Sequence, residues 1–212
     1  MNRVRTLILS MENLKYSFKV VVAGDPEVGK TSMVRVFATG KFEKNYIPTL
    51  GVNILSKNLN FKNVEVAMAI WDLAGQGFMD EVRGQYYSGA RAAILVYDIT
   101  RADTFARIVA WNEECKKFSQ GILTKIIVGN KLDLDSEREV ATGDGIRLAE
   151  EIGAGFVETS AKTGANIEVM FTECAKSLLK SQLMYLENRV SFLTARDGMS
   201  QPAAIVKNES GR

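Results

Sequence analysis

The segment from Gly24 to Thr31 constrains this chain more than any other. It reads Gly-Asp-Pro-Glu-Val-Gly-Lys-Thr, between an apolar run at residues 18–23 and a helical pattern at residues 32–38. A loop between glycines can wrap its backbone N–H groups around an anion, because glycine adopts backbone angles closed to other residues. The following helix adds free N–H groups and the positive end of its dipole. The pattern predicts a phosphate-binding loop, and the alternative is a chance match in a strand–turn–helix unit.

Two side chains of this loop suit a ligand that carries several phosphates. Lys30 can reach the β- and γ-phosphates, and the Thr31 hydroxyl can ligate Mg²⁺. We therefore expect a nucleotide to contact the whole loop and the start of the helix. The expected contacts are Gly24, Asp25, Pro26, Glu27, Val28, Gly29, Lys30, Thr31 and Ser32.

Composition narrows the classes of function. The 212 residues are enough for one α/β domain, and 46% hydrophobic with 25% charged residues is typical of soluble globular proteins. The formal net charge of +2 comes without a basic patch interleaved with aromatics, so we expect no nucleic-acid partner. The absence of histidine excludes His-based catalytic triads and His metal sites. Cys115 and Cys174 lack metal-ligand spacing, and buried free thiols would fit a reducing cytoplasm.

Hydrophobic periodicity predicts an α/β fold with a six-stranded, mostly parallel sheet and about five helices on both faces. Two predicted strands flank a tight turn at residues 61–63 and should form an antiparallel hairpin. The expected strands are 18–23, 51–60, 64–72, 92–98, 125–129 and 155–158. The expected helices are 30–39, 78–88, 102–118, 142–152 and 166 to about 186.

The ends of the chain lack this periodicity. We predict a mobile N-terminal arm over residues 1–15, a folded domain over 16–186 and a flexible tail over 187–212. No stretch is apolar over the length needed to span a bilayer.

Polar residues follow the predicted strand at 64–72, where open α/β sheets bind their ligands. Asp72 is placed to hold the Mg²⁺ shell, and Gly75 can offer a backbone N–H to a γ-phosphate. Gln76 can orient an attacking water. Thr49, in the loop after the first helix, can add a second hydroxyl to Mg²⁺. Each of these segments alone could be an ordinary turn.

Two later strand ends carry residues suited to a guanine base. The Asp133 carboxylate can accept hydrogen bonds from the ring N–H and the amino group of guanine, a pair that adenine cannot supply. The Lys131 stem can lie along the base, and Asn130 can tie loops together. After the last strand come Ser160, Ala161 and Lys162, where the Ala161 N–H could meet the guanine carbonyl oxygen. Either group alone could be a polar loop.

Together these five elements resemble the small GTPases of the Ras superfamily, in the family's order and spacing, over about residues 18–179. The Rab branch looks closest, because residues 71–76, 86–90 and 95–100 resemble Rab stretches. The resemblance implies the small G-domain of the P-loop NTPases. It also implies that Phe42 packs on the guanine and that Tyr46 lies near the phosphates. Some prokaryotic and archaeal relatives lack C-terminal cysteines, as this chain does.

The resemblance implies a monomeric, cytoplasmic switch that binds GTP or GDP with Mg²⁺ and slowly hydrolyses GTP. Lys30, Thr49 and Gln76 would be catalytic, and Thr31, Thr49 and Asp72 would hold the metal. Effector, activating and exchange proteins would bind residues 42–54 and 74–87. Without a C-terminal cysteine we expect no intrinsic lipid anchor, and membrane association stays open.

The phosphate loop departs from the family pattern. Pro26 removes an N–H donor, and Glu27 brings a negative charge towards the phosphates. If Glu27 points outward, nucleotide affinity survives; if it points inward, binding weakens, and the chain would be a non-hydrolysing scaffold with a GTPase shape. Gly77 replaces the glutamate that family exchange factors use. A third reading, an ATPase, is disfavoured by Asp133.

Overall fold

The computed structural model describes residues 14–43, 49, 51–75, 80–119 and 124–198, with side chains for all of these except 80–83 and 190–198. One six-stranded sheet runs in the order β2-β3-β1-β4-β5-β6. Only β2 is antiparallel to its neighbour, so the expected fold class is confirmed. The strands are β1 (Leu14–Gly24), β2 (Val52–Phe61), β3 (Val64–Leu73), β4 (Ala90–Asp98), β5 (Thr124–Asn130) and β6 (Gly155–Glu158).

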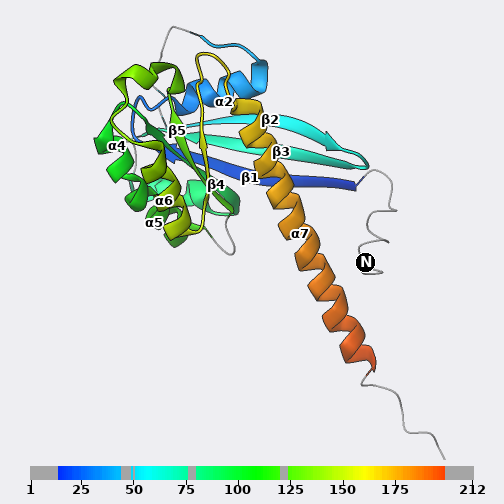
Figure 1. Cartoon of the computed structure of the whole chain (residues 1–212). Coiled ribbons are helices and arrows are strands. Elements are labelled where there is room, and N and C mark those ends of the chain that lie inside the picture. The colour runs from blue at the N-terminus through cyan, green and yellow to red at the C-terminus, as the bar shows by residue number, and fades with distance from the viewer. Residues whose placement is uncertain (1–13, 44–48, 50, 76–79, 120–123, 199–212) are drawn as a thin grey trace, which may run out of the picture.

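Helices cover both faces of this sheet (Figure 1). Two pack on one face: α2 (Lys30–Thr39) and α7 (Ile167–Gly198). The other face is covered by α3 (Asp80–Tyr87), α5 (Ile108–Phe118) and α6 (Thr142–Ile152), and the short α4 (Ala102–Ala106) precedes α5. A 3-10 helix, η1 (Leu132–Glu137), follows β5 and was not predicted.

The central strands are apolar along their length because both of their sides are buried. In β1, Val20 and Val22 pack towards α2 and α7, whereas Val21 and Ala23 pack towards α5. This period of two follows from the alternation of side chains along a strand, and burial on both faces removes the polar half of the pattern. The core fixes the carboxyl ends of the parallel strands β1, β3, β4 and β5 side by side, and the candidate site lies at these ends.

Three differences from the prediction go beyond shifts of one or two residues. β1 begins at Leu14, because its amide N donates to the Asn63 carbonyl at 3.0 Å, so residues 14–15 are not part of an arm. The predicted helix 102–118 is divided at Arg107. α7 continues to Gly198, so the predicted tail is wrong for residues 187–198, where no proline or glycine interrupts the helix before Gly198. Residues 1–13 and 199–212 lie outside the described part.

The helix α7 is long enough to project beyond the sheet. Its first half packs in the core through Met170, Phe171, Cys174 and Leu178, and its second half runs beyond the sheet (Figure 1). None of the helices in the described ranges has the length and apolar character needed to cross a membrane.

Candidate nucleotide-binding site

The loop between β1 and α2 depends on its two glycines. Gly24 has a φ of 144° and Gly29 a φ of 94°, values that L side chains rarely adopt. A Cβ on Gly24 would lie 2.2 Å from the Val96 carbonyl oxygen, and one on Gly29 would lie 2.3 Å from Asn130 Nδ2. The neighbouring strands therefore leave room only for backbone at these positions.

Lys30 places a buried ammonium group inside this loop. Its Nζ donates to the carbonyl oxygens of Gly24 at 2.8 Å and Asp25 at 2.7 Å. Burial lowers the pKa of Lys30 to about 8, against the opposing effect of the Asp72 and Asp25 carboxylates. A cation that is only partly satisfied by carbonyl dipoles is suited to bind phosphate oxygens.

Three oxygen ligands meet beside Lys30. Thr31 Oγ1 donates to Asp72 Oδ2 at 2.6 Å and lies 2.7 Å from Thr49 Oγ1. Burial raises the pKa of Asp72, although the Thr31 hydrogen bond and the Lys30 charge oppose this. Its second oxygen, Oδ1, is buried without a hydrogen-bond partner in the described structure.

These residues fit Mg²⁺. Neighbouring oxygens around an octahedral Mg²⁺ lie about 3 Å apart, close to the separations seen here. The described residues hold no group of three or more acidic, His or Cys ligands, so the protein offers one carboxylate and two hydroxyls. Such a sparse set is typical of Mg²⁺ that is bound jointly with substrate phosphates.

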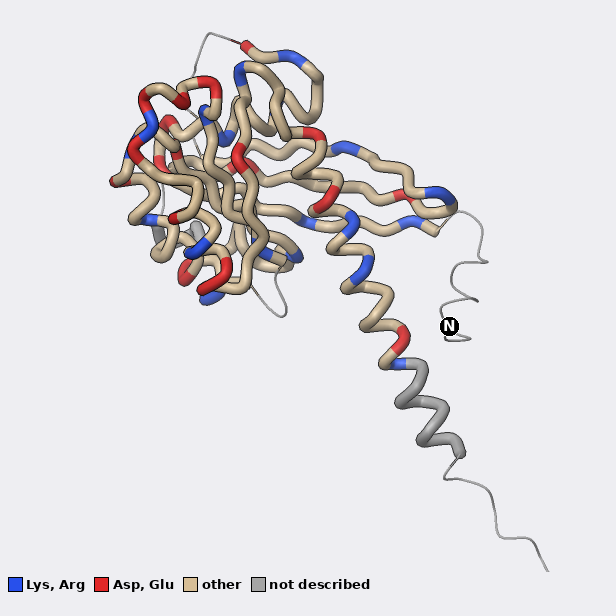
Figure 2. The backbone as a smooth tube through the Cα atoms, in the orientation of Figure 1, with Lys and Arg blue, Asp and Glu red and all other residues tan. Residues whose placement is uncertain are grey.

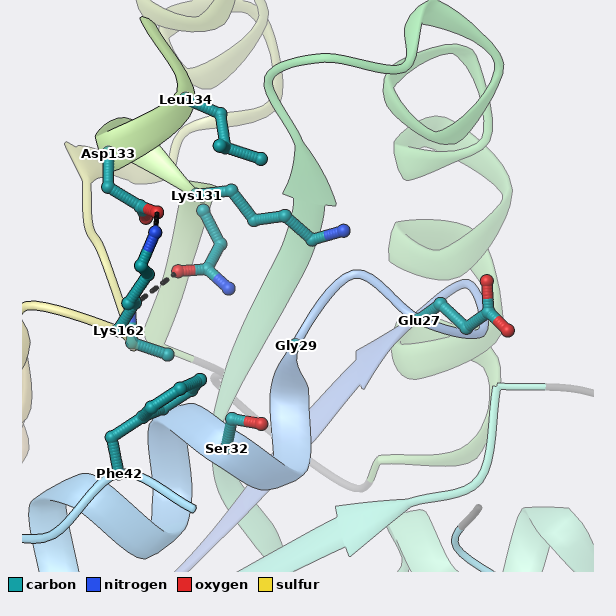
Figure 3. A pocket seen from close by; sticks show the side chains of 10 residues that line it. Glu27, Gly29, Ser32, Phe42, Lys131, Asp133, Leu134 and Lys162 are labelled. Atoms are coloured by element: carbon teal, nitrogen blue, oxygen red, sulfur yellow. Dashed lines mark hydrogen bonds and ion pairs between the residues drawn. The ribbon is translucent and has the colours of Figure 1, made fainter. Parts of the chain in front are cut away.

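A pocket of about 400 Å³ continues from the loop to the ends of β5 and β6. Figure 3 shows Phe42 and Lys131 reaching into it from opposite sides, as a flat ring between them would require. The Lys131 Nζ is fixed by Asp98 Oδ2 at 2.6 Å. The lining residues are Glu27, Gly29, Ser32, Phe42, Asn130, Lys131, Asp133, Leu134, Ala161 and Lys162.

Asp133 lies at the far end of this pocket. Its Oδ1 accepts a 2.5 Å hydrogen bond from Ser160 Oγ, and its Oδ2 lies 3.3 Å from Lys162 Nζ. Burial alone would raise the pKa of Asp133, but the hydrogen bonds from Ser160 and Lys162 outweigh it and the pKa is lowered. The carboxylate is therefore ionised at neutral pH and acts as an acceptor.

Asn130 is hydrogen-bonded to three loops of the site. Its Nδ2 donates to the Val28 carbonyl at 2.8 Å, and its Oδ1 accepts from Thr159 Oγ1 at 3.1 Å and from the Ala161 amide at 3.2 Å. The Ala161 N–H, which we expected to be available to a guanine carbonyl, is thus already engaged.

Comparison with known proteins agrees with this geometry. Residues 19–180 match the profile of the Ras family. This chain belongs to that family. It is similar to Ras-related protein Rab-2B of Dictyostelium discoideum, with 37% identity over 166 residues covering 78% of this chain and 82% of that protein. It is similar to Rab-19 of Mus musculus, with 37% identity over 209 residues (96% and 94%), and to Rab-21 of Canis lupus familiaris, with 39% over 189 residues (89% and 82%).

In this Ras-family protein the two unusual loop residues are accommodated. Glu27 is exposed at a φ of 63°, and Figure 3 shows its carboxylate turned away from Phe42 and Asp133. Pro26 contacts the start of the loop after β3, where a Cβ on Gly75 would lie 2.3 Å from the Pro26 nitrogen. Glu27 is therefore exposed to solvent and lies at the end of the pocket away from Phe42 and Asp133.

Asp25 has a role that sequence reasoning missed. Its carboxylate is buried and accepts a 2.8 Å hydrogen bond from Trp111 Nε1, while Arg107 Nε lies 3.1 Å away. These partners lie on and just before α5, far away in the sequence. No local pattern links an aspartate in a loop to a tryptophan in a later helix.

The structure brings most of the predicted site residues together at the carboxyl ends of the parallel strands. Two loop side chains do not face the pocket: Val28 is buried in the core, and the Asp25 carboxylate is buried against Trp111. Tyr46 and Gln76 lie outside the described residues.

Proposed function

We propose that this Ras-family protein is a switch that binds GTP or GDP with Mg²⁺ and slowly hydrolyses GTP. The observation that carries the proposal is the convergence of two chemistries in one groove. A buried lysine and three oxygen ligands stand at one end, and an ionised aspartate stands at the other. A purine nucleoside with two or three phosphates spans such a pair of sites.

Asp133 supports guanine over adenine. An ionised carboxylate accepts hydrogen bonds and donates none, so it suits the ring N–H and amino group that guanine presents together. Adenine has an acceptor at the corresponding ring position, which the carboxylate would repel. The ATPase reading therefore has no support at this end of the pocket.

The chemistry we propose is positioning and charge neutralisation. The Lys30 ammonium lies against the β- and γ-phosphates, and Thr31, Thr49 and Asp72 hold the metal. When bound, Mg²⁺ supplies positive charge against the phosphate oxygens as negative charge shifts. Gln76 orients the attacking water, and the Gly75 N–H faces the γ-phosphate.

We propose that intrinsic turnover is slow. The Arg107 guanidinium is paired with the buried Asp25 carboxylate. We therefore do not assign Arg107 to the γ-phosphate. A partner protein that donates an arginine would accelerate hydrolysis. The exposed Ile54, opposite Trp71 in the β2–β3 register, and the neighbouring Tyr86 ring form a surface for such partners or effectors. The protein itself acts as a monomer.

The first test is to identify the bound nucleotide. The protein is purified in Mg²⁺ and denatured, and the released nucleotide is identified by chromatography. We expect near one-to-one GDP or GTP, whereas adenine nucleotide would overturn the role of Asp133. A chain that is empty and fails to load GTP would favour the scaffold.

Hydrolysis needs a separate assay. Single-turnover release of γ-phosphate is compared between the native chain and Gln76→Leu, with loading verified for both. We expect a slow rate in the native chain and a further loss in the variant. Equal, background-level release in both would mean that the protein binds GTP without hydrolysing it.

A further inference from the structure

The outer half of α7 forms one wall of a second groove, remote from the nucleotide site. The groove has a volume of about 330 Å³ and lies between α7 and Phe61, at the end of β2. Its apolar lining comes from Phe61, Leu179, Leu183 and Met184, and Met184 is 54% exposed. Apolar side chains that gather on an exposed concave surface are typical of a binding site for another protein.

The lining residues of α7 form one stripe along the helix. They occupy positions 176, 179, 180, 183, 184 and 187, the pattern i, i+3, i+4, i+7, i+8 and i+11. This is the pattern of the side that a helix presents to a partner helix. Tyr185 is as exposed as Met184, at 53%, but at 100° per residue it falls on the opposite side of α7. There its ring lies 5.8 Å from the Arg189 guanidinium.

The charged residues of the stripe select the direction of a partner helix. Lys180 lies towards the sheet, and Glu187 lies seven residues further out on the same side of α7. Figure 2 shows basic positions on α7 near the sheet and an acidic position further out. Lys176 Nζ is paired with Glu173 Oε1 at 2.6 Å, so Lys180 is the basic residue that we assign to an occupant. An occupant with complementary charges would be negative near the sheet and positive further out.

A second α7 has this order of charges when it runs antiparallel. If position 180 of one helix faces position 187 of the other, both Lys180–Glu187 pairs form at once, because two helices of equal rise stay in register. In the same register, Leu183 of each copy faces Met184 of the other. A parallel pair would place Lys180 against Lys180 and Glu187 against Glu187, and like charges repel. The stripe is therefore complementary to itself, as a twofold interface between identical chains requires.

We propose that two copies of this chain pair through the outer halves of their α7 helices, which run antiparallel. Leu183 and Met184 of both copies form the centre of the contact. A Lys180–Glu187 ion pair lies on each side of that centre.

The size of the stripe makes this pairing weak. From position 176 to position 187 the helix rises about 17 Å, and it is about 10 Å wide. Stable complexes bury about 800 Å² on each partner, which is well above what such a strip offers. The chain therefore works as a monomer when it is dilute and pairs where it is concentrated. The contact contains no residue of the nucleotide site, so this inference and the proposed function can fail independently.

Sedimentation equilibrium of the full chain at low salt measures the association. Lys180→Glu and Glu187→Lys each place like charges opposite one another and should raise the dimer Kd at least about fivefold. The variant that carries both substitutions places opposite charges together again and should regain the native Kd. The matched control is Arg189→Glu, on the other side of α7. It changes the net charge as Lys180→Glu does and should leave the Kd within about twofold.

A mixture of two variants tests whether these charges meet between chains. Lys180→Glu has an acidic residue at both positions, and Glu187→Lys has a basic residue at both. Their one-to-one mixture should associate more tightly than either variant alone. A mixture that associates no better than its components would overturn the proposal. A native chain that remains monomeric at concentrations near 1 mM would also overturn it.

A second comparison probes the apolar centre. Met184→Ser and Tyr185→Ser are a matched pair, because both native side chains are about half exposed in the single chain. Met184→Ser should raise the Kd at least about tenfold, whereas Tyr185→Ser should change it less than about twofold. Circular dichroism checks that each variant keeps its helix content. Equal effects of the two substitutions would mean that the association does not use the groove, and the proposal would be wrong.

Discussion

The buried Asp25 carboxylate gives the sharpest quantitative prediction, because its two partners differ in exposure. Trp111 is 3% exposed, and its Nε1 donates to Asp25 Oδ1 at 2.8 Å. Arg107 Nε lies 3.1 Å from the same oxygen, but its side chain is 47% exposed. Burial rather than formal charge should therefore decide which partner stabilises the fold.

The magnitudes follow from these environments. Trp111→Phe removes a hydrogen bond to a charged, buried acceptor and should cost about 1.5–3 kcal/mol in the free energy of unfolding. Arg107→Gln removes a solvent-screened ion pair and should cost less than about 1 kcal/mol. For a domain of this size the Tm should fall by about 3–12 °C in the first variant and by less than about 4 °C in the second.

Urea unfolding followed by circular dichroism measures both values. The experiment is run without nucleotide and with EDTA, so that ligand binding does not mask the difference. Equal slopes of free energy against urea in both variants would show that the unfolded states are comparable. If Arg107→Gln proved as destabilising as Trp111→Phe, the ion pair would dominate and our argument from burial would be refuted.

Three further predictions concern the nucleotide site. Asp133→Asn replaces an ionised acceptor and should weaken GDP binding at least about tenfold, as measured by equilibrium titration. Unchanged selectivity for guanine over adenine nucleotides would exclude the role of Asp133. Lys30, with a pKa of about 8, is charged below that pH and neutral above it, so GDP binding should take up about 0.1 proton at pH 7 and about 0.9 at pH 9. Calorimetry in buffers of different ionisation enthalpy measures this, and a constant uptake would contradict it. Asn130→Ala leaves the Val28 carbonyl and the Ala161 amide without their hydrogen-bond partner. The free energy of unfolding, measured in urea, should fall by about 2–4 kcal/mol. A loss below about 1 kcal/mol would show that Asn130 does not join the loops.

Local patterns were sufficient for much of the fold. The helix at residues 30–39 was predicted within its observed bounds, because Gly40 ends it in a left-handed conformation. The helix at 142–152 and the strand at 155–158 were also confirmed. The prediction failed where an element depends on residues far away in the sequence, or where the sequence holds no signal that ends a helix. The start of β1 depends on pairing with Val64–Ala67, and the length of α7 depends on the lack of a stop signal.

The candidate site was also predictable only in part. Strand ends and residue types predicted Lys30, Asp72 and Asp133 in one site, and in the structure the Thr31 hydroxyl is hydrogen-bonded to Asp72 and lies beside Thr49. The left-handed backbone of Glu27 could not be predicted from the sequence, because a residue other than glycine rarely adopts it. The pairing of Asp25 with Trp111 was equally inaccessible, since it joins two elements only through the tertiary packing of the domain.

The two edges of the sheet differ in how they meet other chains. β6 is only four residues long, whereas β2 extends over ten and offers a row of backbone groups that no second strand of the described sheet covers. Such an edge is a template for strand-by-strand aggregation. Along its solvent side Ser56, Asn58 and Asn60 are polar, and Ile54 is not. Lys57 and these polar side chains make most of the edge a poor template, whereas the surface proposed for partners lies at the apolar end of the same edge, at Ile54.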